Sequence, residues 1–240
     1  GGERSLLERV QYISSVSGGS LATAYYAALK PPKTEPVLGD QGLSPAYQKF
    51  FSAYKEAMQE NFEWPAALRQ VLFFRLFNST KGAYSLAEVW DDKFFSEMTF
   101  AGLYERERRG DSPRVILNGT SYNTGKRFAL TTLSPEDFNY DFVDRFIEKL
   151  KARLGSNINP VGLAIIVKNL ESAKEHFLPL TFEQIGANHH ELRLSLGVAT
   201  SASFPPIVGP VTYSVDGHPP YQHIGDGGLF DNLGTESLAT

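Results

Sequence analysis

The chain has 240 residues, of which 42% are hydrophobic and 21% charged, and it is long enough to bury the core of one globular domain. Its net charge of -4 argues against nucleic acid as a partner, because a phosphate backbone is held by a strongly basic face. The absence of cysteine excludes disulfides, thiolate zinc sites and a cysteine nucleophile.

No apolar run approaches the ~20 residues of a membrane span, and the first residues do not lead into a signal-peptide core. We therefore expect a protein that is soluble or peripheral to a membrane, and the favoured location is cytoplasmic or peripheral. The compartment and the oligomeric state stay open at this stage.

A strand, a turn and a helix are predicted at the start of the chain. Residues 5–10 favour a short helix, and the β-rich residues 12–16 favour a strand that leads into Ser17-Gly18-Gly19. The Ala-, Leu- and Tyr-rich residues 20–29 then predict a helix, which the following prolines end. Ser17 is thus placed at a strand-turn-helix junction.

Residues 44–78 are predicted to form a helical, aromatic-rich insertion that begins at Ser44-Pro45. Its aromatic side chains would cover a site as a cap, contact lipid, or fill the core, and core packing is the commoner role of such helical faces. The aromatic residues are Phe50, Phe51, Tyr54, Phe62, Trp64, Phe73, Phe74 and Phe77.

Strands and helices alternate through the rest of the chain, which indicates an α/β domain. Residues 85–88 have the form of a capping box and predict a helix through Phe95, and residues 113–132 predict a β-hairpin. An amphipathic helix is expected over residues 141–154, closed by Gly155.

Ser17 is the candidate nucleophile, because a catalytic hydroxyl must project from a tight turn with small neighbours. Gly18 and Gly19 supply that setting, and Ser15 stands where the G-x-S-x-G pattern has its first glycine. The alternative is that Ser17 only caps the helix that follows it.

Asp226 is the candidate base. It lies between Gly225 and Gly227, with Gly228 next, so the chain can turn sharply and bring the carboxylate to another loop. An aspartate is a weak base in water, with a reference pKa of about 3.9, so the site would have to desolvate and position it. The alternative is a plain Asp-Gly turn.

A Ser-His-Asp triad would need a histidine, and none of the five has a diagnostic setting. They are His176, His189, His190, His218 and His223. No metal-ligand spacing and no nucleotide-binding glycine loop is present, so we expect neither a metal nor a cofactor.

Four segments, in order along the chain, resemble the patatin-like phospholipase family and in particular its bacterial members. Residues 13–20 look like the family's nucleophile segment, and residues 224–234 look like its D-G-G segment. Between them, residues 113–120 with 124–128 resemble its N-A-T strand and T-G turn, and residues 198–206 resemble its A-S-A-A-F-P helix end.

The resemblance implies a three-layer α/β/α sandwich with a mainly parallel central sheet, spanning residues 1–240 as one catalytic domain. It also implies hydrolysis of lipid acyl esters by a Ser-Asp dyad, without a histidine or an obligatory metal. In that scheme Ser17 attacks the carbonyl, Asp226 takes its proton, and the Gly18 N–H binds the oxyanion. The implied substrate is a lipid or phospholipid at a membrane surface.

The family's Gly-rich oxyanion loop, typically G-G-G-x-R-G, normally precedes the nucleophile segment by a full helix. Only Gly1-Gly2 precede Ser17 here, so we expect the domain to be truncated at its N-terminus, and at Thr240 as well. Loss of an oxyanion donor typically lowers the rate by ~10²–10³. An inactive family member that binds lipid or protein is therefore the alternative to a phospholipase A or lysophospholipase.

Overall fold

The structure is a computed structural model that describes residues 5–60, 81–139, 141–154, 159–205, 208–215 and 218–238. The described α-helices are α1 (Gly18–Leu29), α2 (Pro45–Gln59), α4 (Lys81–Trp90), α5 (Phe100–Arg109), α6 (Asp141–Leu154), α7 (Pro160–Phe177) and α8 (Leu194–Ser201). The described strands are β1 (Tyr12–Val16), β2 (Leu38–Gly39), β3 (Gly42–Leu43), β4 (Arg114–Ser121), β5 (Arg127–Thr131), β6 (Leu180–Thr181), β7 (Val211–Val215) and β8 (His218–Asp226).

Short helical turns join these elements. They are the 3-10 helices η1 (Leu6–Arg9), η4 (Pro135–Asp137), η5 (His189–Glu191), η6 (Gly227–Leu229) and η7 (Glu236–Leu238), and the π-helical turn η3 (Asp91–Phe95). The predicted strand, turn and helix around Ser17 and the hairpin of β4 and β5 are confirmed.

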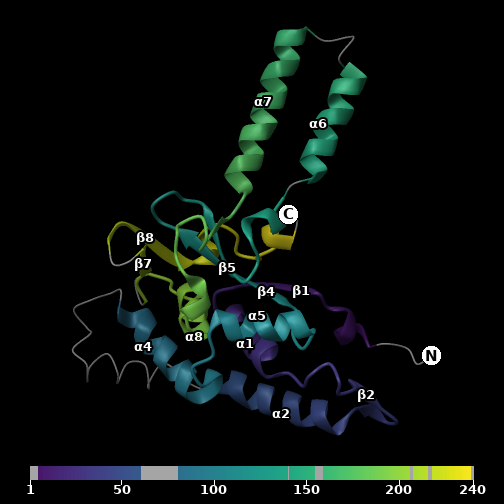
Figure 1. Ribbon diagram of the computed structural model, residues 1–240, viewed down its shortest axis with the longest axis vertical. Coiled ribbons are helices and arrows are strands. Elements are labelled where there is room, and N and C mark those ends of the chain that lie inside the picture. Colours follow the sequence, from purple (N-terminus) through teal and green to yellow (C-terminus); the bar gives the residue numbers. More distant parts are fainter. Residues whose placement is uncertain are drawn as a thin grey trace.

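The main sheet has the order β6-β5-β4-β8-β7, and β1 also pairs with β4. The α/β class is confirmed, but the sheet is mixed rather than mainly parallel (Figure 1). Strand β4 is parallel to β1 and antiparallel to both β5 and β8. The physical reason is the tight connection from β4 to β5, since two consecutive strands joined by a short turn must run antiparallel.

Both faces of the central strands are buried. Val115 and Leu117 of β4 join the main core with apolar residues of α1, α4, α5 and α8. Ile116, which points to the opposite face, packs in a smaller cluster with Phe138 beyond η4 and with Leu178 after α7. Helices and loops thus cover the sheet on two sides, as expected for an α/β sandwich.

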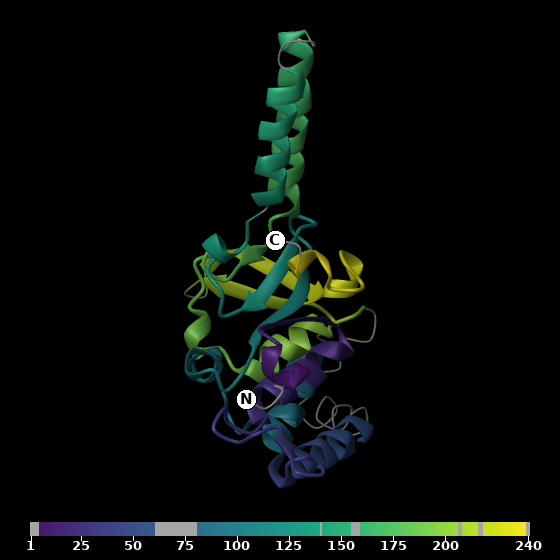
Figure 2. The same ribbon diagram turned by 90° about the vertical axis from the view of Figure 1, so that its right-hand side faces the viewer.

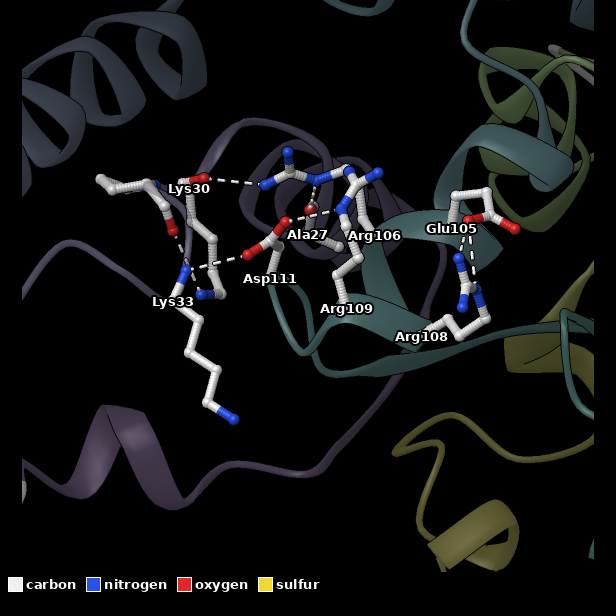
Figure 3. Close-up of polar contacts among 9 residues, drawn as sticks. Ala27, Lys30, Lys33, Glu105, Arg106, Arg108, Arg109 and Asp111 are labelled. Carbon is white, nitrogen blue, oxygen red and sulfur yellow. Dashed lines mark hydrogen bonds and ion pairs between the residues drawn. The ribbon is translucent and has the colours of Figure 1, made fainter.

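Helix α1 follows Ser17 directly and is fixed at its carboxyl end by a side chain of α5. Arg106 donates from Nε to the Ala27 carbonyl (3.0 Å) and from Nη2 to the Lys30 carbonyl (2.8 Å), as Figure 3 shows. These bonds occupy carbonyl groups that the last turn of a helix leaves without a partner. The element that begins at the candidate nucleophile is therefore held at both ends.

The aromatic residues of α2 pack against α1. Tyr25 contacts Phe50, Tyr54 and Phe94 with ring centroids 5.3–6.3 Å apart, and Phe50 is only 7% exposed. In the described part of the predicted 44–78 insertion, these side chains fill a core cluster. Residues 61–80 of that prediction lie outside the described residues.

The hairpin of α6 and α7, which we call the arm, rises away from the rest of the molecule in both views (Figures 1 and 2). The expected helix over residues 141–154 is confirmed as α6. Among the described helices, none combines the length and apolar character that would be needed to cross a bilayer.

One predicted helix start is wrong. Helix α4 begins at Lys81, so Ser85 lies inside it instead of capping it. The Ser85 hydroxyl donates to the Lys81 carbonyl four residues earlier (3.3 Å), which lets a serine sit within a helix.

Candidate active site

Ser17 occupies a strained turn between β1 and α1. Its φ of 53° and ψ of -133° lie in a region that residues with a side chain rarely adopt. Holding such a conformation costs roughly 1–3 kcal/mol, and strain of this kind is concentrated at functional sites. The backbone N–H of Ser17 donates to the Ser201 carbonyl (3.1 Å), and its carbonyl accepts from the Ser20 N–H (2.9 Å). This strand, strained serine and helix have the arrangement of a nucleophile elbow.

Asp226 ends β8 and is 2% exposed. Its N–H donates to the Ser203 carbonyl (3.0 Å), and its Oδ1 accepts from the Gly228 N–H (2.7 Å). The other oxygen, Oδ2, is buried and has no hydrogen-bond partner in the described structure. A buried carboxylate oxygen without a partner is costly, so it marks a position where a ligand or a reacting group would be accommodated.

The sheet brings these two residues to one place. Strand β5 occupies one edge of β4, while β1 and β8 lie one after the other along the opposite edge. Val16 pairs with Asn118, and Asp226 pairs with the next residue, Gly119. The carboxyl ends of β1 and β8 therefore meet, and Ser17 follows one end while Asp226 forms the other.

Asn118 ties the two strand ends together. It is fully buried, and its Nδ2 donates to Ser14 Oγ (2.8 Å) and to the Ser15 carbonyl (2.9 Å). Its carbonyl accepts from Ser201 Oγ (2.6 Å), and its Oδ1 accepts from Ser237 Oγ. The sequence alone indicated no role for Asn118, although it lies within the N-G-T segment that supported the resemblance.

The hydroxyl at position 15 is accommodated by a buried chain of serines. Ser15 Oγ lies 3.3 Å from Ser20 Oγ, which lies 2.7 Å from Ser201 Oγ. The chain links β1, α1 and α8 behind the nucleophile turn. A Cβ added to Gly19 would lie 3.9 Å from the Ser15 Cβ, so the strand and the helix approach closely at this point.

The glycines of the two motifs have different surroundings. A Cβ added to Gly18 would meet nothing within 4 Å, so there is open space in front of the first residue of α1. A Cβ at Gly227 would lie 2.4 Å from the Asn118 carbonyl oxygen, and one at Gly228 would lie 3.0 Å from Asp226 Oδ1. Gly227 and Gly228 thus permit the close approach that seats Asp226.

The carboxylate of Asp226 makes no hydrogen bond to a histidine in the described structure, since only Gly228 donates to it. His223, three residues before Asp226, instead places its Nδ1 3.0 Å from Thr212 Oγ1. Tyr122 lies closer to the site, where burial and then the charge of Asp226 raise the pKa of its phenol. Within the described ranges, no three His, Asp or Glu side chains gather as a metal site would require.

Comparison with known proteins gives the chain a family. The model of the Patatin-like phospholipase family matches residues 3–239. The chain belongs to this family. Searches of curated proteins and of solved structures each found no match. As a member of the patatin-like phospholipases, the chain is a lipid acyl hydrolase by family.

Membership in the patatin-like phospholipases also explains why the four motif segments occur together. All four contribute to the geometry just described: Ser17 and Asp226 lie on the first and last, Asn118 lies on the second, and Ser201 and Ser203 lie on the third. Gly1 and Gly2, the glycines compared with the family's oxyanion loop, lie outside the described residues.

Proposed function

We propose that the protein is a phospholipase A or lysophospholipase that cleaves lipid acyl esters through a Ser17–Asp226 dyad and an acyl-enzyme intermediate. The observation that carries this proposal is the meeting of β1 and β8 along one edge of β4. It supports the proposal because the strained Ser17 follows the end of β1, while β8 ends in a buried carboxylate whose Oδ2 has no hydrogen-bond partner in the described structure.

In the acylation step, Ser17 Oγ attacks the carbonyl carbon of the ester while Asp226 Oδ2 takes the hydroxyl proton. The negative charge that develops on the carbonyl oxygen is stabilised by the Gly18 N–H and the positive end of α1. The tetrahedral intermediate collapses when the C–O bond to the alcohol breaks, and Asp226 returns the proton to the leaving oxygen.

Deacylation repeats the sequence with water. Asp226 takes a proton from the water as its oxygen attacks the acyl carbon, and the intermediate then releases the carboxylic acid. The proton passes back to Ser17 Oγ, so the enzyme is regenerated with one ester bond and one water consumed. The Gly228 N–H on Oδ1 would hold the carboxylate in one orientation through both steps.

The proposal is tested by p-nitrophenyl ester hydrolysis and by fluorophosphonate labelling of Ser17→Ala and Asp226→Asn. We expect both variants to lose turnover by on the order of 10³-fold or more, because the two groups act as a unit. Labelling should be lost in Ser17→Ala. Matched controls are Ser52→Ala and Asp40→Asn, which change exposed residues outside the site and should keep wild-type turnover.

Two other outcomes would contradict the dyad proposal. If folded wild-type protein neither hydrolyses esters nor reacts with the fluorophosphonate, the dyad proposal fails. The lipid- or protein-binding module described from the sequence would then be the better account. If turnover survives both substitutions and is lost when a histidine is replaced, a Ser-His-Asp enzyme is indicated instead.

A further inference from the structure

The arm exposes apolar side chains that its own two helices cannot cover. Among its described side chains, only Ile147 and Val167 are buried. The other described side chains are partly or fully exposed, because a two-helix hairpin has a single interface. The most exposed of the large apolar residues are Val161 (65%), Ile165 (56%), Phe146 (53%), Phe177 (41%) and Ile166 (40%). A surface of this kind indicates a binding partner.

Over their full length α6 and α7 carry six basic and five acidic residues, and the charge of the outer arm, residues 145–168, indicates which partner. Residues 145–168 contain five basic residues and one acidic residue, a net charge of +4, in a chain whose net charge is -4. The rest of the chain therefore carries -8. The basic residues are Arg145, Lys149, Lys151, Arg153 and Lys168, and all five are exposed. Exposed apolar residues flanked by lysine and arginine match an anionic lipid surface.

A groove on the arm is also lined by both apolar and basic side chains. Its lining includes Val143, Phe146 and Leu170 together with the cations Arg145 and Lys149. An amphiphile with an acyl chain and a negatively charged head group would fit such a groove, because the chain would contact the apolar residues and the head would contact the cations.

The base of the arm lies beside the segment that follows Asp226. The rings of His176 and Phe177 at the end of α7 contact Phe230, with centroids 6.4 Å apart. Arg127 also donates to the Phe177 carbonyl (3.2 Å), so the end of α7 is joined to β5. A surface bound by the arm would thus be coupled through this base to the loop that carries the candidate catalytic aspartate.

We propose that the arm docks the protein on anionic membrane surfaces, with its exposed apolar residues entering the boundary between head groups and acyl chains. This inference rests on the proposed function, because it takes lipid to be the substrate class. It adds which part of the protein contacts the membrane and that the membrane lipid is anionic. A second copy of the chain is the less favoured partner, because the outer arms of two copies, residues 145–168, would bring +4 against +4.

The test is cosedimentation with vesicles of phosphatidylcholine alone or mixed with phosphatidylglycerol, in a Ser17→Ala background that prevents hydrolysis. The arm variant combines Lys149→Gln, Lys151→Gln and Arg153→Gln, and the body control combines Lys49→Gln, Lys55→Gln and Arg108→Gln. Both triple variants change the net charge equally and alter exposed residues. Any difference in vesicle binding between the two variants therefore depends on whether the lost positive charges lay on the arm or on the body.

We expect binding to the anionic vesicles only, and a loss of about 5-fold per arm cation, hence about 10²-fold for the arm variant. The body control should bind like its parent, and raised salt should weaken both. A tryptophan in Ile165→Trp should shift its emission to the blue on anionic vesicles, whereas one in Leu29→Trp, a position 39% exposed on α1, should not.

Three results would overturn the docking proposal: equal losses in the arm variant and the body control, equal binding to neutral and anionic vesicles, or an arm variant that changes only the oligomeric state. None of these depends on ester hydrolysis. Vesicle binding without turnover in the catalytically intact protein would contradict the dyad and leave the docking proposal standing.

Discussion

At the scale of single residues, the backbone of Ser17 is the most informative feature. A serine with φ of 53° and ψ of -133° holds a conformation that glycine adopts with less strain. The fold imposes it, because Ser201 accepts the Ser17 N–H on one side and α1 begins at the next residue. A strained residue between a strand and a helix is the backbone setting that a nucleophile elbow requires.

The strain at Ser17 predicts that a glycine variant is more stable than an alanine variant at this position, which is the reverse of the order inside a helix. We expect Ser17→Gly to be more stable than Ser17→Ala by roughly 1 kcal/mol in the free energy of unfolding, because only glycine relieves the strain. At Ser52, inside α2, the order should be the usual one, with Gly less stable than Ala by about 1 kcal/mol. Urea denaturation of the four variants measures both differences. An Ala variant at position 17 that matches or exceeds Gly would show that the turn stores no strain.

The sequence indicated candidate residues for the site, but it did not indicate which residues hold them in place. Ser17 and Asp226 could be chosen because glycines beside them mark sharp turns, which is a local signal. Asn118 gave no such signal. Its partners Ser14, Ser201 and Ser237 come from three separate segments, and a hydrogen-bond network of that kind exists only after long-range folding.

At the scale of elements, Glu107 shows how α5 is attached to the sheet. Its Oε1 accepts the N–H of Val115 in β4 (3.2 Å), and its Oε2 accepts the hydroxyl of Thr132 just after β5. Burial raises the pKa of Glu107 from its ordinary value of 4.5 to about 7, although the hydrogen bonds from Thr132 and Val115 oppose the shift. Helix α5 is therefore docked by a carboxyl group that favours its protonated form.

The raised pKa of Glu107 predicts a pH dependence. Its contribution to stability is fully present below about pH 4.5 and is lost as pH rises to about 7, since the folded state binds the proton more tightly there. Glu107→Gln should remove this dependence, because Gln can accept from Val115 and donate to Thr132. Urea denaturation at pH 5 and pH 7.5 measures it. Glu105→Gln on the exposed face of α5 is the control, and an equal change in both variants would contradict the assignment.

The relative directions of the strands were the part of the fold that could not be predicted from the sequence. Residues 12–16 were correctly assigned to a strand and residues 113–132 to a hairpin from composition and turn signals. That β8 runs antiparallel to β4 and continues the edge begun by β1 depends on pairing between distant segments. Helix α7 was also missed as an element, since its apolar run lacks the clear two-sided pattern that marked α6.

At the scale of the whole molecule, the arm and the body have separate cores. The arm buries Ile147 and Val167 between its own helices, whereas the main core lies between the sheet and α1, α4, α5 and α8. The ion pair of Lys174 with Asp144 joins the two helices near the base. The outer part of the arm therefore contributes little to the stability of the body.

A shortened arm tests this separation. Replacing residues 149–169 by a Gly-Gly-Ser-Gly linker should change the free energy of unfolding by less than about 1 kcal/mol, roughly 2–4 °C in the melting temperature. Turnover of a soluble p-nitrophenyl ester should be retained, whereas hydrolysis of lipid in anionic vesicles should fall. Calorimetry and the two assays measure these effects. Loss of soluble-ester turnover in a folded variant would show that the arm shapes the site itself.

The meeting of β1 and β8 along one edge of β4 also determines when the site can form. Ser14 bonds to Gly234, a residue 220 positions away, and the strand that ends in Asp226 is the last of the described strands. During synthesis the nucleophile turn emerges before β8, and the carboxylate of Asp226 cannot lie beside it until the chain has grown by the 209 positions from Ser17 to Asp226. Hydrolytic competence would thus depend on pairing between distant segments and would follow the closure of this part of the sheet.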